Sequence, residues 1–218
     1  MSRDESRRRL APLWRSYDVD ELARAKVPEA AANALAARGL PDNAYEYFVR
    51  VPERELKVTE LPMCGRAAFL GQHEDGWNNT YWLSLTDGSV WMRYGGRDEP
   101  VDHVKRINSS VPALQNMLDV YCAFEADELE AEDDLQAHAD LVCRTVLHAV
   151  STEPELFADS ENWWPRTFEE IGYSAPGILR GDKVLYEYVQ RDRSGRWELN
   201  HPGYEEDDDE LSSRRPGR

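Results

Sequence analysis

Residues 80–94 read TYWLSLTDGSVWMRY and contain the clearest local pattern of the chain. Two aromatic-rich segments, 80–85 and 89–94, lie on either side of Asp87-Gly88, a dipeptide that tolerates positive φ. Two strand-like segments separated by such a dipeptide predict a β-hairpin with a two-residue turn of the primed type. Three further segments have strand-like composition and lie on both sides of this hairpin, at 45–51, 67–70 and 101–107.

Helical spacing of apolar residues appears before and after these strands. We expect helices at 20–38, 111–124, 135–149 and 163–171, and a final hairpin from 184–189 and 196–199. Pro28 is expected to break the first helix, and Gly39 to end it. Strands that are grouped, and do not alternate with helices, favour an α+β domain over a doubly wound one. We therefore predict a mainly antiparallel sheet of about five or six strands flanked by helices.

The length of 218 residues suits one domain with tails. Residues 1–19 are rich in arginine and are expected to form a loose N-terminal arm. Residues 20–201 are expected to form the single folded domain. Residues 202–218 are polar and acidic, which is typical of a disordered tail.

The formal net charge is −16, and much of it lies in two acidic runs, 125–134 and 205–210. Such runs are solvated linkers, or they attract a basic partner protein; both interpretations stay open. Direct nucleic-acid binding is disfavoured because phosphates need a basic face. No apolar run reaches the roughly 20 residues of a membrane span, and no signal peptide is recognisable. We therefore expect a cytoplasmic protein without membrane contact.

Motifs of catalysis are missing from the sequence, and so are those of metal or cofactor binding. The three cysteines are far apart and form no CxxC pair. The residues that an enzyme would have to use are His73, Asp75, His103 and Cys64, and their spacing matches no known constellation. We expect no enzyme activity, no cofactor and no metal.

Residues 73–79, HEDGWNN, form a polar connection between two predicted strands and carry a tryptophan. An aromatic side chain in such a loop either covers the edge of the core or anchors a protein interface. Both interpretations stay open. The candidate partner-binding residues are Asp75, Trp77 and Asn78.

Four features in order give the chain a family resemblance. They are Ala36-Ala37-Arg38-Gly39-Leu40-Pro41, then Ala68-Phe69-Leu70-Gly71 followed by Tyr81-Trp82-Leu83-Ser84-Leu85, then Asp87-Gly88-Ser89-Val90-Trp91, and finally Ile107-Asn108-Ser109-Ser110-Val111-Pro112-Ala113-Leu114. Trp163-Trp164-Pro165 fits the tryptophan-bearing C-terminal helix of the same proteins. Over roughly residues 20–175 the chain resembles the SUKH superfamily, in particular its fourth immunity subfamily from bacterial polymorphic-toxin systems. The chain departs from the family pattern in the longer loop with Trp77 and in the segment from Gly181 onward.

This resemblance implies an α+β domain that binds and neutralises a cognate toxin, often a nuclease or deaminase, without a cofactor or catalytic residues. The negative net charge fits a toxin with a basic surface. A housekeeping regulatory or scaffold protein of the same fold is the alternative, because a fold does not determine a function.

Overall fold

A computed structural model describes residues 12–45, 47–74, 79–95, 103–131, 135–159, 161–174, 189–191 and 197–199. Its elements in chain order are β1 (Trp14–Arg15), α2 (Val19–Ala25), α3 (Glu29–Ala37), β2 (Leu40–Pro41), β3 (Asn43–Ala44), β4 (Phe48–Val49), β5 (Val58–Leu61), β6 (Gly65–Gln72), β7 (Thr80–Ser84), β8 (Val90–Tyr94), β9 (His103–Asn108), α4 (Val111–Ala131), α5 (Leu135–Thr152), α6 (Pro154–Phe157), α7 (Trp163–Ser174), β10 (Val189–Arg191) and β11 (Trp197–Leu199). The predicted α+β class is confirmed.

The centre of the fold is a seven-stranded antiparallel sheet in the order β3-β4-β6-β7-β8-β9, with β5 also paired to β6. The predicted hairpin is present as β7 and β8, in which Trp82 pairs with Trp91 and Leu83 with Val90. Because successive side chains of a strand point to opposite faces, both faces of this apolar hairpin have to be covered.

The main hydrophobic core lies between one face of the sheet and the helices. Tyr81, Leu83, Val90 and Met92 enter it from the hairpin, and Leu114 and Leu118 enter it from α4. The opposite face has a smaller core formed by Leu61, Cys64, Ala67, Phe69, Trp82 and Val104. Arg54 lies over this smaller core, with its guanidinium 4.1 Å from the centre of the Phe69 ring.

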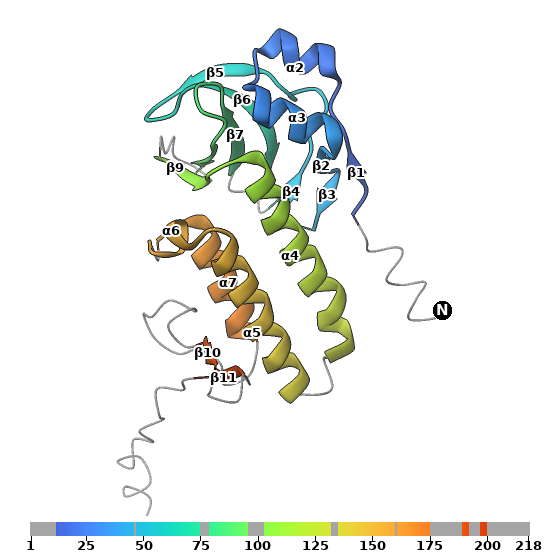
Figure 1. The fold of residues 1–218 in the computed structure, drawn as a ribbon, viewed down its shortest axis with the longest axis vertical. Coiled ribbons are helices and arrows are strands. Elements are labelled where there is room, and N and C mark those ends of the chain that lie inside the picture. Colours follow the sequence, from blue (N-terminus) through green and yellow to red (C-terminus); the bar gives the residue numbers. More distant parts are fainter. Residues whose placement is uncertain are drawn as a thin grey trace, which may run out of the picture.

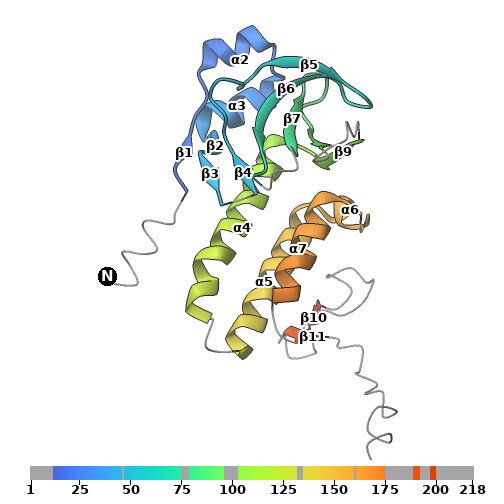
Figure 2. The ribbon, with the colours of Figure 1, turned by 180° about the vertical axis from the view of Figure 1, so that it is seen from behind.

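The helices form two groups, which Figures 1 and 2 show from opposite sides. Helices α2 and α3 lie beside the sheet, while α4 begins under the sheet and runs out beyond it. Helix α5 returns along α4, and α7 lies next to α5. None of the helices in the described part combines the length and the apolar composition that a membrane crossing requires.

The break at Pro28 and the stop at Gly39 are confirmed. Asp18 caps α2 by accepting hydrogen bonds from the backbone N–H groups of Asp20 and Glu21. Pro28 is the N-cap of α3, and Gly39 follows α3 with a φ of 75°. Positive φ favours glycine, which is the reason that Gly39 stands at this point.

The expected strand at 45–51 is wrong. The chain reverses between β3 and β4, with Tyr45 at a positive φ of 53°, so the two short strands pair with each other. The apolar residues of this segment reflect contacts with the core and not one long strand. Phe48 is fully buried, and the Tyr47 carbonyl accepts a hydrogen bond from Tyr81 Oη.

The turn of the central hairpin also differs from the prediction. Gly88 has a positive φ of 78°, but Asp87 does not, so the two-residue primed turn is not formed. The backbone N–H of Gly88 bonds to the Ser84 carbonyl, and Asp87 Oδ1 accepts from the N–H and Oγ of Ser89. These local hydrogen bonds stabilise a wider connection than a dipeptide turn.

The N-terminal boundary of the folded part lies before residue 20. Trp14 and Arg15 pair with Pro41 and Leu40, and Tyr17 is 5% exposed in the main core. The side chain of Arg50 donates to the Arg15 carbonyl at 2.8 Å. The expectation of a loose arm through residue 19 is therefore wrong for residues 14–19, because burial of Tyr17 and strand pairing hold this segment. Residues 1–11 lie outside the described part.

The remaining difference concerns the length of an element. Helix α4 continues through most of the first acidic run to Ala131, whereas the expected helix ended at residue 124. Alanine, leucine and glutamate favour the helix, and no glycine or proline interrupts this stretch. The final hairpin is confirmed as β10 paired with β11, and the first part of its expected first strand, 184–188, lies outside the described residues. The expected tail, 202–218, and its acidic run lie outside the described residues.

Candidate partner-binding surface

The loop with the three candidate partner-binding residues is closed at both ends. Asp75, Trp77 and Asn78 themselves lie outside the described residues, whereas His73 and Asn79 are described and buried. The backbone N–H of His73 donates to the Asn79 carbonyl at 2.9 Å. Asn79 Oδ1 accepts from the N–H of Gly95 at 3.1 Å, which ties the loop to the end of β8. The loop therefore leaves and re-enters the fold at fixed points.

An aromatic platform lies at the base of this loop. We use this name for Tyr47, His73, Tyr94, Tyr121 and Trp163. The His73 ring meets Tyr47 edge-on at 5.0 Å and Trp163 at 5.2 Å between ring centres. Tyr47 and Tyr121 are 4.2 Å apart, and Tyr94 lies 6.0 Å from Trp163. The platform joins His73, at the described start of the loop, to the turn between β3 and β4 and to β8, α4 and α7.

Two tyrosines of the platform stay protonated at ordinary pH. Burial and then the hydrogen bond to Glu125 raise the pKa of Tyr121, and burial raises that of Tyr94. Tyr121 Oη donates to Glu125 Oε1 at 2.5 Å, so the first residue of the acidic run is attached to the platform. In the described part, the buried Trp163 Nε1 and Tyr94 Oη have no hydrogen-bond partner.

Of the described residues that an enzyme would have to use, Cys64 lies apart from the two histidines. His73 belongs to the platform, and His103 lies next to it, with its ring 5.4 Å from that of Tyr94. Cys64 lies on the other face of the sheet, in the smaller core. Among the residues that the structure describes, no group of three or more metal-ligating side chains comes together. Asp75 is outside that part of the chain.

Both described cysteines are poor nucleophiles, and their reactivity is a direct test of their burial. Burial raises the pKa of the Cys64 thiol to about 11 and that of Cys122 to about 12. The reactive form is the thiolate, and with these pKa values its fraction at pH 8 is on the order of 0.1% or less.

We expect iodoacetamide to label both residues at least about 100-fold more slowly in the native protein than in denaturant at pH 8, measured for each site by peptide mass spectrometry. Fast native labelling of Cys64 would contradict this burial and revive it as a nucleophile.

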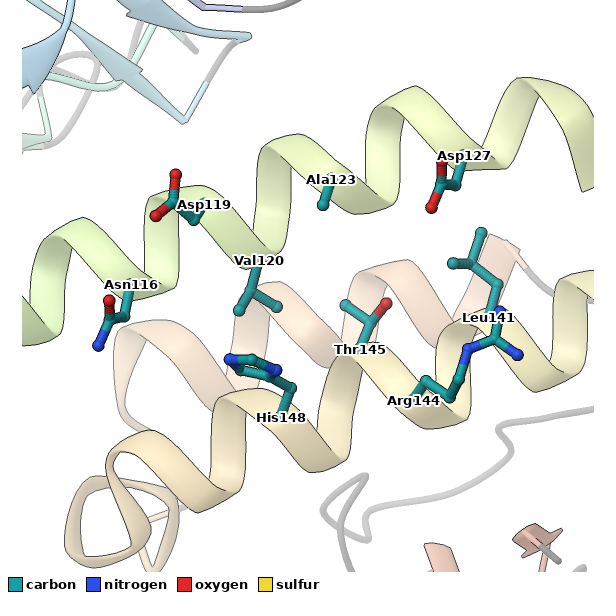
Figure 3. Close-up of a pocket in the computed structure, with 9 residues that line it drawn as sticks. All are labelled: Asn116, Asp119, Val120, Ala123, Asp127, Leu141, Arg144, Thr145 and His148. Atoms are coloured by element: carbon teal, nitrogen blue, oxygen red, sulfur yellow. The ribbon is translucent and has the colours of Figure 1, made fainter.

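A second candidate surface lies between α4 and α5, and the sequence did not indicate it. A pocket of about 470 Å³ is lined by Asn116, Asp119, Val120, Ala123 and Asp127 of α4 and by Leu141, Arg144, Thr145 and His148 of α5. Figure 3 shows Asp127 and Arg144 toward one end and Asn116 and His148 toward the other. The lack of any helix breaker between Phe124 and Ala131 was the signal that α4 continues and can form this wall.

The geometry of this surface indicates a protein that binds another macromolecule. An antiparallel sheet with helices on one face holds both ends of the loop beside the aromatic platform, and loops held by such a scaffold commonly carry binding residues. Compared with known families, residues 16–170 match the SUKH-4 immunity protein family. The chain belongs to the SUKH-4 immunity protein family, as the resemblance in the sequence predicted. The comparison with curated proteins found no match, and neither did the comparison with solved structures.

Membership of this family suggests an immunity function against a toxin, and such a function implies binding of that toxin. Proteins of an immunity family are generally non-catalytic.

Proposed function

We propose that the chain binds a cognate toxin through the loop 73–79 and neutralises it without catalysis, in the cytoplasm. The observation that carries the proposal is the family match, and the aromatic packing of His73 beside the described start of the loop supports it. Rigid support lowers the entropy lost when a loop is ordered on binding, and so raises affinity. Asp75, Trp77 and Asn78 are the proposed contact residues, with Trp77 as the anchor.

The proposed partner is a toxin with a basic surface, of the nuclease or deaminase class. The net charge of −16 favours such a partner, and so does the position of Glu125, which the Tyr121 hydroxyl holds beside the platform. Acidic residues near a contact surface attract a basic protein and speed its association. Inhibition would follow from covering the active site or the substrate groove of the toxin.

The proposal predicts the effect of replacing Trp77 with alanine. We expect a loss of about 2 kcal/mol in binding, or about 30-fold in Kd, because a buried interface tryptophan typically contributes this much. The melting temperature should change little. Titration calorimetry with the isolated toxin domain gives the first quantity, and thermal unfolding gives the second.

A matched control removes an exposed apolar side chain elsewhere. Met63 is 86% exposed in the turn between β5 and β6, so Met63→Ala should leave both the affinity and the melting temperature unchanged. If Trp77→Ala lowers the melting temperature strongly and the affinity no more than Met63→Ala does, then Trp77 belongs to the core and not to the interface.

A further inference from the structure

Two buried hydrogen-bond donors of the aromatic platform meet no acceptor in the described part of the chain. They are Tyr94 Oη, at the end of β8, and Trp163 Nε1, at the start of α7. Their rings are neighbours, with centres 6.0 Å apart and planes inclined at 63°. Burial raises the pKa of Tyr94, so its hydroxyl keeps its proton and stays a donor. The platform therefore holds two unused donors on adjacent rings.

This arrangement is unfavourable in the free protein. A buried donor that has lost its bonds to water without gaining an acceptor destabilises the fold. Other buried tryptophans of the chain avoid this loss. Trp164 Nε1 donates to Asn108 Oδ1 at 3.0 Å, and Trp82 Nε1 donates to Thr80 Oγ1 at 2.8 Å. Because buried polar groups are nearly always bonded in native proteins, the two exceptions on the platform require a physical explanation.

A strained residue lies against the same platform. Tyr45 meets Tyr121 edge-on, with ring centres 6.2 Å apart. Its φ of 53° is unusual for a residue with a bulky side chain. Its buried Oη is also without a hydrogen-bond partner in the ranges that the structure covers. Backbone strain of this kind clusters where proteins bind ligands or partners, so it points to the same part of the molecule as the two donors.

The rings that carry the two donors reach the surface of the protein. Tyr94 and Trp163 are half-buried, whereas His73 and Tyr121 beneath them are buried. A rotation of either half-buried side chain would bring its polar atom to the surface, and such rotamer changes are common when interfaces form. An indole N–H can only donate, so the group that fits the pair is an oxygen acceptor, such as a main-chain carbonyl.

We propose that Tyr94 and Trp163 form a recognition site for a carbonyl oxygen of the bound toxin. In the free protein the two donors destabilise the fold, and in the complex they bond to the toxin. The site rests on the proposed function, because the toxin is its occupant. It lies next to the start of the proposed contact loop, since the Trp163 ring is 5.2 Å from that of His73.

The substitution Tyr94→Phe tests the site because its two expected effects have opposite signs. Without the hydroxyl the ring still packs and one unsatisfied donor is gone, so the melting temperature of the free protein should rise by about 2–4 °C. The affinity for the isolated toxin domain should fall about fivefold, because the complex loses a hydrogen bond. Thermal unfolding and titration calorimetry on the full chain measure the two quantities.

Tyr17→Phe is the matched control. Tyr17 is buried away from the platform, and its hydroxyl donates to the Leu70 carbonyl at 3.4 Å. Removal of this bonded hydroxyl should lower the melting temperature and leave the affinity unchanged. The second donor has a readout of its own. The Trp163 indole N–H resonance, assigned by its loss in Trp163→Phe, should move downfield when the toxin domain is added, as a new hydrogen bond requires.

The outcomes separate this site from the proposed function. A melting temperature that does not rise in Tyr94→Phe means that the hydroxyl is already satisfied in the free protein, and this result overturns the site. If the wild-type chain binds the toxin domain and Trp77→Ala weakens binding but Tyr94→Phe does not, the site fails and the proposed function stands. If the wild-type chain binds no toxin domain, the proposed function fails and the site fails with it.

Discussion

Replacing Trp164 with alanine is expected to lower the free energy of unfolding by about 3–5 kcal/mol. Trp164 is fully buried on α7, and its ring lies 6.2 Å from that of Phe168. Its Nε1 donates to Asn108 Oδ1 at 3.0 Å, within the core. Truncation leaves a cavity and also leaves the Asn108 oxygen without its donor, so two costs add. Guanidinium unfolding followed by circular dichroism measures the change.

The same experiment with Trp164→Phe separates these two costs. Phenylalanine keeps most of the apolar volume but cannot donate, so we expect a smaller loss of about 1–2 kcal/mol. The position of α7 matters for function because the adjacent Trp163 belongs to the aromatic platform. If Trp164→Ala costs less than about 1 kcal/mol, α7 is not docked on the sheet as described, and the platform loses its support.

A comparably large effect is expected for Gly39→Ala, which should lower the free energy of unfolding by about 3 kcal/mol or more. A Cβ at this position would lie 1.7 Å from the Arg15 carbonyl oxygen, a backbone atom that cannot turn aside as a side chain would. The φ of 75° adds strain for any residue with a Cβ. The loss should appear in guanidinium unfolding as an earlier midpoint with an unchanged slope.

Gly65 provides the matched control for Gly39. It has the same φ of 75°, but a Cβ built there meets no atom within 4 Å. Gly65→Ala should therefore lower the free energy of unfolding by about 1 kcal/mol, because only the backbone conformation is strained. Equal losses for the two variants would mean that the close approach of Arg15 to Gly39 does not exist, and that residues 14–16 do not pack as described.

The elements that the sequence predicted correctly are those with strong local signals. The apolar alternation around Asp87-Gly88 indicated β7 and β8, and Pro28 and Gly39 indicated the ends of the first two helices. Asn108-Ser109-Ser110 indicated the start of α4. The structure adds a reason for this last signal, since Ser109 donates through both its N–H and Oγ to the buried carboxylate of Glu153. That contact joins residues 44 positions apart, so no local pattern predicts it.

The errors arose where tertiary contacts decide the structure. Trp14 and Tyr17 lie in an arginine-rich stretch, but Trp14 pairs with Pro41 and the Tyr17 hydroxyl donates to the Leu70 carbonyl, and both partners are distant in sequence. Tyr45 to Val51 has the composition of a strand, but the core around Phe48 forces a reversal. The apolar stripe of α4 ends near residue 124, but the helix propensity of the acidic run extends the helix to Ala131.

The candidate site was predictable in part. The sequence singled out the loop 73–79 as a polar connection with a tryptophan, and both of its described ends are fixed in the structure. The platform beneath it combines side chains from 47, 73, 94, 121 and 163, and only the fold brings such distant positions together. The partner-binding role of Asp75, Trp77 and Asn78 stays a prediction.

The most direct test of the account is affinity purification of the tagged chain from its native cells, followed by mass spectrometry and an activity assay on the captured protein. The account predicts one dominant partner with a toxin domain, bound one to one, whose activity is lost when the chain is added. A housekeeping partner, or a toxin that remains active in the complex, would contradict the immunity function and favour a scaffold protein of the same fold.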